Sequence, residues 1–167
     1  RPAIASIIPS ANKPVVLLDL GANVECRATH LSQFAVLGTT YSRIILEKKR
    51  PKVGLLSNGV EANKGTEILR EAHRLLNLMD LNYVGYTEAR SLPFGAVDVL
   101  VTDGFVGNIV LKLSEGVVEA LIEKLRSQLS SSLFKRIIFS AISKSLKVFR
   151  EEVDWRQVGG APILGLR

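Results

Sequence analysis

Short apolar segments that alternate with helical segments constrain the fold more than any other feature of this sequence. Residues 15–20 and 97–101 are nearly continuous runs of valine and leucine, and Val53–Leu56 is a shorter run of the same kind. Such runs are typical of strands that are buried on both faces of a parallel sheet. Residues 31–46 and 66–78 instead repeat apolar residues at helical spacing. This alternation predicts an α/β layered sheet.

The other segments extend the pattern. Ala3–Ile8 and residues 83–86 are expected to be two more strands, which gives the order β-β-α-β-α-β-β-α, and residues 109–129 are expected to form a long helix. We therefore divide the chain into three parts: an incomplete α/β sheet domain at 1–104, a helical hairpin at 105–150, and a Gly-rich return to the sheet domain at 151–167.

Composition excludes several classes of protein. The apolar fraction of 47% and the charged fraction of 23% are ordinary for a globular domain and exclude disorder, collagen and coiled coil. A single cysteine, Cys26, excludes an internal disulfide framework and a Cys-rich zinc module, and we expect a reducing cytoplasm and no metal. No apolar run is long enough to span a membrane, and no secretory signal is visible.

The positive charge of the chain is localised. Residues 121–150 contain seven Lys and Arg residues and one Glu, so this segment alone matches the net charge of +6 of the whole chain. A localised basic patch indicates an acidic partner, a nucleic acid or an anionic membrane. Within it, residues 133–142 have helical apolar spacing with a basic side. The segment is either a membrane-surface helix or a packing and dimer helix, and it includes Phe134, Lys135, Arg136, Ile137 and Ile138.

Three loops of similar composition follow predicted strands. Residues 19–23, 58–65 and 102–108 each combine glycine with asparagine. Ligands of open α/β sheets bind outside the carboxyl ends of the strands, and glycine N–H groups bind anions. The third loop leads into a helix whose N-terminus favours phosphate, with Lys112 about one turn further along. These features predict an anion site, although ordinary strand-to-helix turns use the same residues.

Nucleotide cofactors are not indicated. No G-x-G-x-x-G follows a strand, and the second loop departs from the P-loop pattern because Lys64 and Gly65 are exchanged. His30 follows the first loop and would either contact a ligand or cap a helix, and the capping role is favoured. His73 is expected on a helix surface, and Cys26 is interpreted as a packing residue.

Taken together, the loop sequences resemble the bacterial phosphate acyltransferase family of phospholipid synthesis, the PlsX family. The matching stretches follow the family's order across essentially the whole chain, and residues 102–108 are the most specific. They are residues 14–23, 33–38 and 53–56, Glu61, Lys64, Gly65, residues 102–108, Leu111, Lys112, Gly159, Gly160 and Ala161.

This resemblance implies a fold and an activity. The implied fold is a three-layer α/β/α sheet of the isopropylmalate dehydrogenase and phosphotransacetylase type, with a projecting helical hairpin. Family members transfer an acyl group from acyl-(acyl carrier protein) to inorganic phosphate, for phospholipid synthesis, without an organic cofactor. They are homodimers at the inner face of the cytoplasmic membrane, and we expect no nucleic-acid partner. The alternatives are a phosphotransacetylase-like transfer from acyl-CoA and a non-catalytic membrane scaffold that recruits acyl carrier protein.

The matched positions also suggest site residues. Phosphate is assigned to the third loop, with Lys112 as a supporting cation, Asn23 and Asn108 as oxyanion donors, and Asp103 orienting a donor. Residues expected to bind substrate are Asp19, Gly21, Glu61, Lys64, Gly65, Gly104 and Gly107. Family chains are much longer than this one, so we expect an internal or C-terminal portion that holds part of the active site and could be inactive alone.

Overall fold

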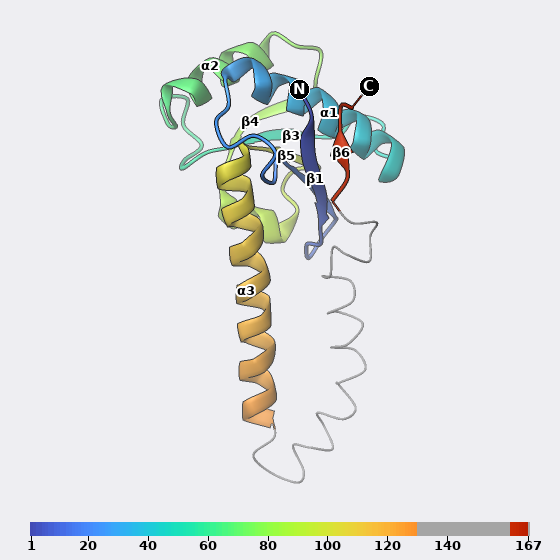
Figure 1. Cartoon of the computed structure of the whole chain (residues 1–167), viewed down its shortest axis with the longest axis vertical. Coiled ribbons are helices and arrows are strands. Elements are labelled where there is room, and N and C mark those ends of the chain that lie inside the picture. The colour runs from blue at the N-terminus through green and yellow to red at the C-terminus, as the bar shows by residue number, and fades with distance from the viewer. Residues whose placement is uncertain (130–160, 167) are drawn as a thin grey trace.

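The structure of the protein is a computed structural model, and it describes residues 1–129 and 161–166. The chain order of the elements follows the predicted alternation (Figure 1). The elements are β1 (Ala3–Ile8), β2 (Val15–Leu18), α1 (Ala28–Ile45), β3 (Val53–Leu56), α2 (Glu67–Asn77), β4 (Tyr83–Thr87), the 3₁₀ helix η1 (Ala89–Phe94), β5 (Val99–Val101), α3 (Gly104–Leu129) and β6 (Ile163–Leu164).

The described strands form one sheet in the order β4-β3-β5-β2-β1-β6. The four strands β4, β3, β5 and β2 are parallel, whereas β1 runs antiparallel to β2 and to β6. The loops that follow β2, β3 and β5 therefore leave the sheet at the same edge. This topology brings the three glycine- and asparagine-containing loops to one end of the molecule.

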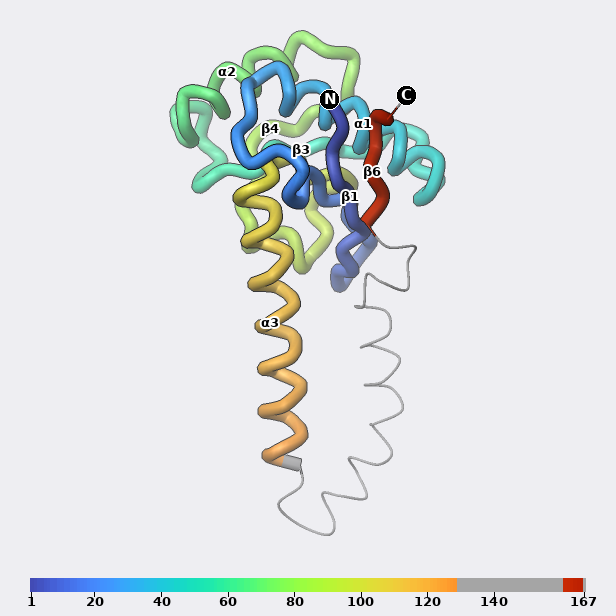
Figure 2. Tube along the Cα trace, viewed as in Figure 1, coloured from blue at the N-terminus to red at the C-terminus, as the bar shows by residue number. Residues whose placement is uncertain are grey.

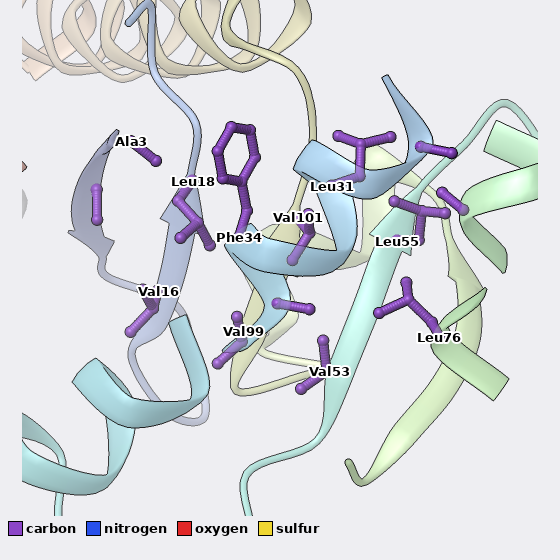
Figure 3. Close-up of a cluster of buried hydrophobic side chains, with 14 of the residues drawn as sticks. Ala3, Val16, Leu18, Leu31, Phe34, Val53, Leu55, Leu76, Val99 and Val101 are labelled. Carbon is purple, nitrogen blue, oxygen red and sulfur yellow. The ribbon is translucent and has the colours of Figure 1, made fainter. Parts of the chain in front are cut away.

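Helices α1 and α2 cover one face of the sheet. Figure 3 shows Leu31 and Phe34 of α1 and Leu76 of α2 pointing into side chains from β2, β3 and β5. The approach of α1 is close at Gly38, where an added Cβ would lie 2.5 Å from Val99 Cγ1. Phe34 and Leu76 are fully buried, which explains why the helical spacing of apolar residues was a reliable signal in these segments.

A second apolar cluster lies on the opposite face. Leu17 and Leu100 point away from α1 and pack with Leu92 of η1 and Leu111 of α3. Because successive side chains of a strand point to opposite faces, residues that are apolar at every position are needed where both faces are covered. The fold is thus a three-layer α/β/α sheet, as predicted.

Helix α3 begins earlier than predicted and extends away from the sheet. It starts at Gly104 rather than at residue 109. Only its first turns contact the sheet, and the rest of the helix projects from the body (Figure 1). A row of half-exposed apolar side chains with a spacing of four residues follows its length: Phe105, Ile109, Leu113, Val117, Leu121 and Leu125.

The predicted hairpin tip lies outside the described residues, as do Phe134, Lys135, Arg136, Ile137 and Ile138. After this segment, β6 pairs with β1 at the edge of the sheet (Figure 2), with Ala3 opposite Leu164. Among the helices that the structure describes, none has the length and hydropathy needed to cross a bilayer.

Candidate functional site

A cleft of about 870 Å³ lies at the carboxyl end of the parallel strands. It is formed by the loop after β2 and by the first turns of α1, α2 and α3, so three helix N-termini converge on it. Its lining residues are Arg1, Ala22, Asn23, Val24, Glu25, Cys26, Arg27, His30, Leu31, Thr66, Ile68, Leu69, Asp103, Phe105 and Val106.

Asp19 holds the loop beneath the cleft. Its carboxylate is fully buried and accepts hydrogen bonds from the backbone N–H groups of Ile4 (2.9 Å), Ala22 (3.2 Å) and Asn23 (2.7 Å). A fourth bond comes from the side-chain amide of Asn23 at 2.8 Å. Asp19 was predicted to bind substrate, but its burial and these four bonds make it a scaffold for the loop.

Asn23 is also occupied by the protein. Its Nδ2 donates both to Asp19 Oδ2 at 2.8 Å and to the carbonyl oxygen of Pro2 at 2.7 Å. Its Oδ1 accepts from Arg1 Nε. Because an amide group has two N–H donors, none remains for the oxyanion that the sequence analysis assigned to it. In this structure Asn23 positions Arg1 and the loop.

The start of α3 packs directly on this loop. Gly104 N donates to Asn23 O at 2.8 Å, and Asp103 Oδ1 caps the helix by accepting from Val106 N at 2.8 Å. A Cβ at Gly107 would lie on the carbonyl oxygen of Asp19. Gly104 and Gly107 were predicted to cradle substrate, but these contacts make them glycines of close packing, and their N–H groups already have protein acceptors.

Asn108 and Lys112 are exposed on α3, outside the residues that line the cleft. Asn108 lies one turn beyond Phe105, and Lys112 Nζ pairs with Glu115 Oε2 at 3.2 Å, further from the helix start. Their assigned catalytic roles stay predictions. Gly21 adopts a φ of 137°, which favours glycine at this turn, and it too is exposed rather than part of the cleft wall.

The second loop is not brought into the cleft. Asn58 Oδ1 accepts from Gly65 N at 3.0 Å and closes the loop, while Glu61 and Lys64 are exposed. Only the start of α2, which follows this loop, reaches the cleft, through Thr66, Ile68 and Leu69. The substrate-binding roles of Glu61, Lys64 and Gly65 therefore stay predictions.

Cys26 and His30, which sequence reasoning treated as packing and capping residues, both line the cleft. Burial, followed by the negative charges of Asp103 and Asp19, raises the pKa of Cys26 to about 11, so the thiol is protonated at neutral pH. His30 Nδ1 accepts from Arg27 N at 3.2 Å, which is the predicted capping role. Burial and the nearby Arg1 and Arg27 charges lower the pKa of His30 below 6.5, so its ring is neutral at pH 7.

Arg27 is the charged residue that sequence analysis missed. Its side chain is exposed at the cleft, and it takes part in none of the ion pairs found within residues 1–129 and 161–166. Its place directly before α1 was the available signal, because that helix start follows the first loop. No group of three or more potential metal ligands occurs in the described part of the chain.

Two solved structures define the class of fold. The EutD phosphotransacetylase from Staphylococcus aureus superposes with a TM-score of 0.57 at 18% sequence identity, over 70% of this chain and 42% of that chain. A phosphotransacetylase from Streptococcus pyogenes gives a TM-score of 0.56 at 22% identity, over the same shares of the two chains. The class is a phosphotransacetylase-like α/β fold.

Sequence comparison identifies the family within this class. Residues 1–167 match the model of the family described as fatty acid synthesis protein. The phosphate acyltransferase of Syntrophotalea carbinolica is 48% identical over 167 residues, which are 100% of this chain and 48% of that protein. The phosphate acyltransferase of Geobacter sulfurreducens is 45% identical over 166 residues, 99% of this chain and 48% of that protein. The chain belongs to the fatty acid synthesis protein family, as the loop sequences indicated, and spans about half the length of the curated relatives it matches.

Proposed function

We propose that the protein takes part in the transfer of an acyl group from a thioester to inorganic phosphate, with acyl-(acyl carrier protein) as the donor and acyl phosphate as the product for phospholipid synthesis. The observation that carries this proposal is the cleft itself. It joins positive charge, at Arg1 and Arg27, to apolar side chains of α2 and α3. An acyl phosphate has the same two parts, an anionic head and an aliphatic chain.

The proposed reaction needs positioning more than a protein nucleophile. An oxygen of hydrogen phosphate forms a bond to the acyl carbon, the C–S bond breaks with its electron pair leaving on sulfur, and the proton of hydrogen phosphate ends on the thiol. Cys26 takes no part as a nucleophile in this scheme, because its raised pKa keeps the thiol protonated. Arg27 attracts the phosphate dianion, and alignment of the reactants supplies most of the rate.

A phosphotransacetylase-like transfer from acyl-CoA is the second candidate. The two structural neighbours carry that name, but at 18% and 22% identity they support the fold alone. The exposed apolar side chains of the cleft favour a longer acyl chain over acetyl. A non-catalytic scaffold that recruits acyl carrier protein is the third candidate, because the chain spans only half the length of its relatives.

One assay separates these candidates. The intact protein is incubated with inorganic phosphate and either acyl-(acyl carrier protein) or acyl-CoA of the same chain length, and acyl phosphate is trapped with hydroxylamine. We expect the hydroxamate from the carrier-protein thioester at a kcat/KM at least about tenfold above that for CoA. A preference for CoA would favour the second candidate, and no product from either donor would favour the scaffold.

We also propose that α3 carries the partner surface of the protein, as part of a homodimer at the inner face of the membrane. The row of half-exposed apolar residues with a spacing of four supports this proposal, because a helix in solvent has no need of such a row. Leu113→Glu with Leu121→Glu tests it by sedimentation velocity. A wild-type sedimentation coefficient in this variant would remove the dimer proposal.

A further inference from the structure

The inference concerns which part of the cleft contacts the acyl chain, and it rests on the proposed function. Three elements that are distant in sequence each present a large apolar side chain to the same concave surface. Val24 of the first loop is 60% exposed, Ile68 of α2 is 47% exposed and Phe105 of α3 is 58% exposed. Val106 and the partly buried Leu69 continue this wall.

These side chains have no packing role that explains their positions. Ile68 is not part of either apolar cluster, and neither is Phe105. Folding leaves about half of each side chain in water, which is unfavourable for apolar surface. Phe105 follows Asp103 and Gly104, whose contacts fix the start of α3 against the first loop, so the ring is held at the cleft by the most constrained part of the helix.

We propose that Ile68 and Phe105 form the wall along which the acyl chain of the substrate lies, and that they set the preference of the protein for chain length. The apolar wall continues into the polar part of the cleft, where Arg27 and His30 lie. A ligand that fills both parts carries an anionic head next to an aliphatic chain. A flat partner protein fits the outer row of α3 better, because that row is convex and the cleft is hollow.

The test compares chain lengths in matched variants of the intact protein. Phe105→Ser and Ile68→Ser remove the wall, and Phe105→Leu retains an apolar side chain. Phe94→Ser is the control, because Phe94 is 62% exposed but does not line the cleft. Each variant is assayed with butanoyl and dodecanoyl thioesters of acyl carrier protein. We expect Phe105→Ser to lower kcat/KM at least about tenfold for dodecanoyl and less than about twofold for butanoyl.

Rescue and control outcomes decide the inference. Phe105→Leu is expected to stay within about threefold of wild type on dodecanoyl, and Phe94→Ser to leave both rates unchanged. Equal losses on the two thioesters would overturn the inference, including the case in which Phe105→Ser loses stability or assembly because other protein covers the wall. This result leaves the proposed function intact as long as the wild type forms acyl phosphate.

A binding measurement keeps the two proposals separate. Decyl phosphate and butyl phosphate, below their micellar concentrations, are titrated into wild type and Phe105→Ser by calorimetry. We expect wild type to bind decyl phosphate at least about tenfold more tightly than butyl phosphate, and Phe105→Ser to lose most of this ratio. Without this chain-length preference in wild type the inference fails, whether or not the protein is catalytic.

Discussion

The loops after β2 and β3 have similar sequences, but the structure uses them differently. Residues 19–23 are fixed from within by Asp19 and lie under the cleft, whereas residues 58–65 are closed by the Asn58–Gly65 hydrogen bond and point Glu61 and Lys64 into solvent. Both loops contain glycine, asparagine and an acid. The difference teaches that this composition indicates a turn at the end of a strand, and that burial decides whether the turn organises a site.

The largest expected difference between the loops is in stability. Asp19→Ala leaves the backbone N–H groups of Ile4 and Asn23 without their acceptor, and each such group costs about 1–3 kcal/mol. We expect the free energy of unfolding to fall by about 3 kcal/mol, against less than about 1 kcal/mol for Asn58→Ala, whose bond is exposed. Urea denaturation measures both. Equal losses would mean that the second loop is as constrained as the first.

The contact between the first loop and α3 is tested by two glycines of the same helix. Gly107→Ala drives a methyl group onto the Asp19 carbonyl oxygen and is expected to cost about 1–3 kcal/mol of unfolding free energy. Gly116→Ala meets nothing within 4 Å and should stabilise the helix by up to about 1 kcal/mol. Thermal melts of the two variants should shift in opposite directions. A shift of the same sign would remove close packing as the reason for Gly107.

The cations that follow the two loops should differ in phosphate binding. Arg27 lines the cleft, so Arg27→Ala is expected to raise the KM for phosphate at least about tenfold through loss of a charged hydrogen bond. Lys64 is exposed away from the cleft, and Lys64→Ala should raise it less than about threefold. Steady-state kinetics with saturating thioester measure both values. A larger effect of Lys64→Ala would place the anion at the second loop, as the family resemblance suggested.

The smallest expected signal comes from the thiol beside the first loop. The pKa of Cys26 is raised to about 11, so the reactive thiolate is scarce at pH 7 and increases about tenfold per pH unit up to that pKa. Iodoacetamide should therefore modify Cys26 slowly at pH 7, with a rate that rises steadily from pH 8 to pH 10. Mass spectrometry follows the reaction, and decyl phosphate should slow it. A rate that levels off near pH 8 would show an ordinary exposed thiol.

Much of the fold could be predicted from local pattern. Val53–Leu56 is a strand with the predicted bounds, and α2 begins and ends within one residue of the predicted segment, where Thr66 accepts from Leu69 N as its N-cap. The start of α3 was missed by five residues, because Gly104 and Gly107 disfavour a helix by propensity. Packing against the first loop overrides that propensity, and the loop is 80 residues away in sequence.

The candidate site was predicted less completely. Asn23 and Asp103 were expected at one edge of the sheet and both line the cleft, but their polar atoms are spent largely within the protein. Arg27 and Thr66 were not predicted, because neither belongs to a motif that signals chemistry. Residue type indicates what a side chain can donate or accept, while its partners are set by segments that only the folded chain brings together.

The sequence by itself determined the alternation of strands and helices, the two covered faces of the sheet and the family, since these depend on local apolar spacing and on loop motifs. The tertiary structure alone decided which loop lies under the cleft, that Asp19 and Gly107 serve as scaffold, and that Val24, Ile68 and Phe105 share one apolar wall. The physical reason is that hydrogen-bond satisfaction and close packing depend on neighbours in space, and a carboxylate or a phenyl ring carries no local sign of whether those neighbours are protein, water or ligand.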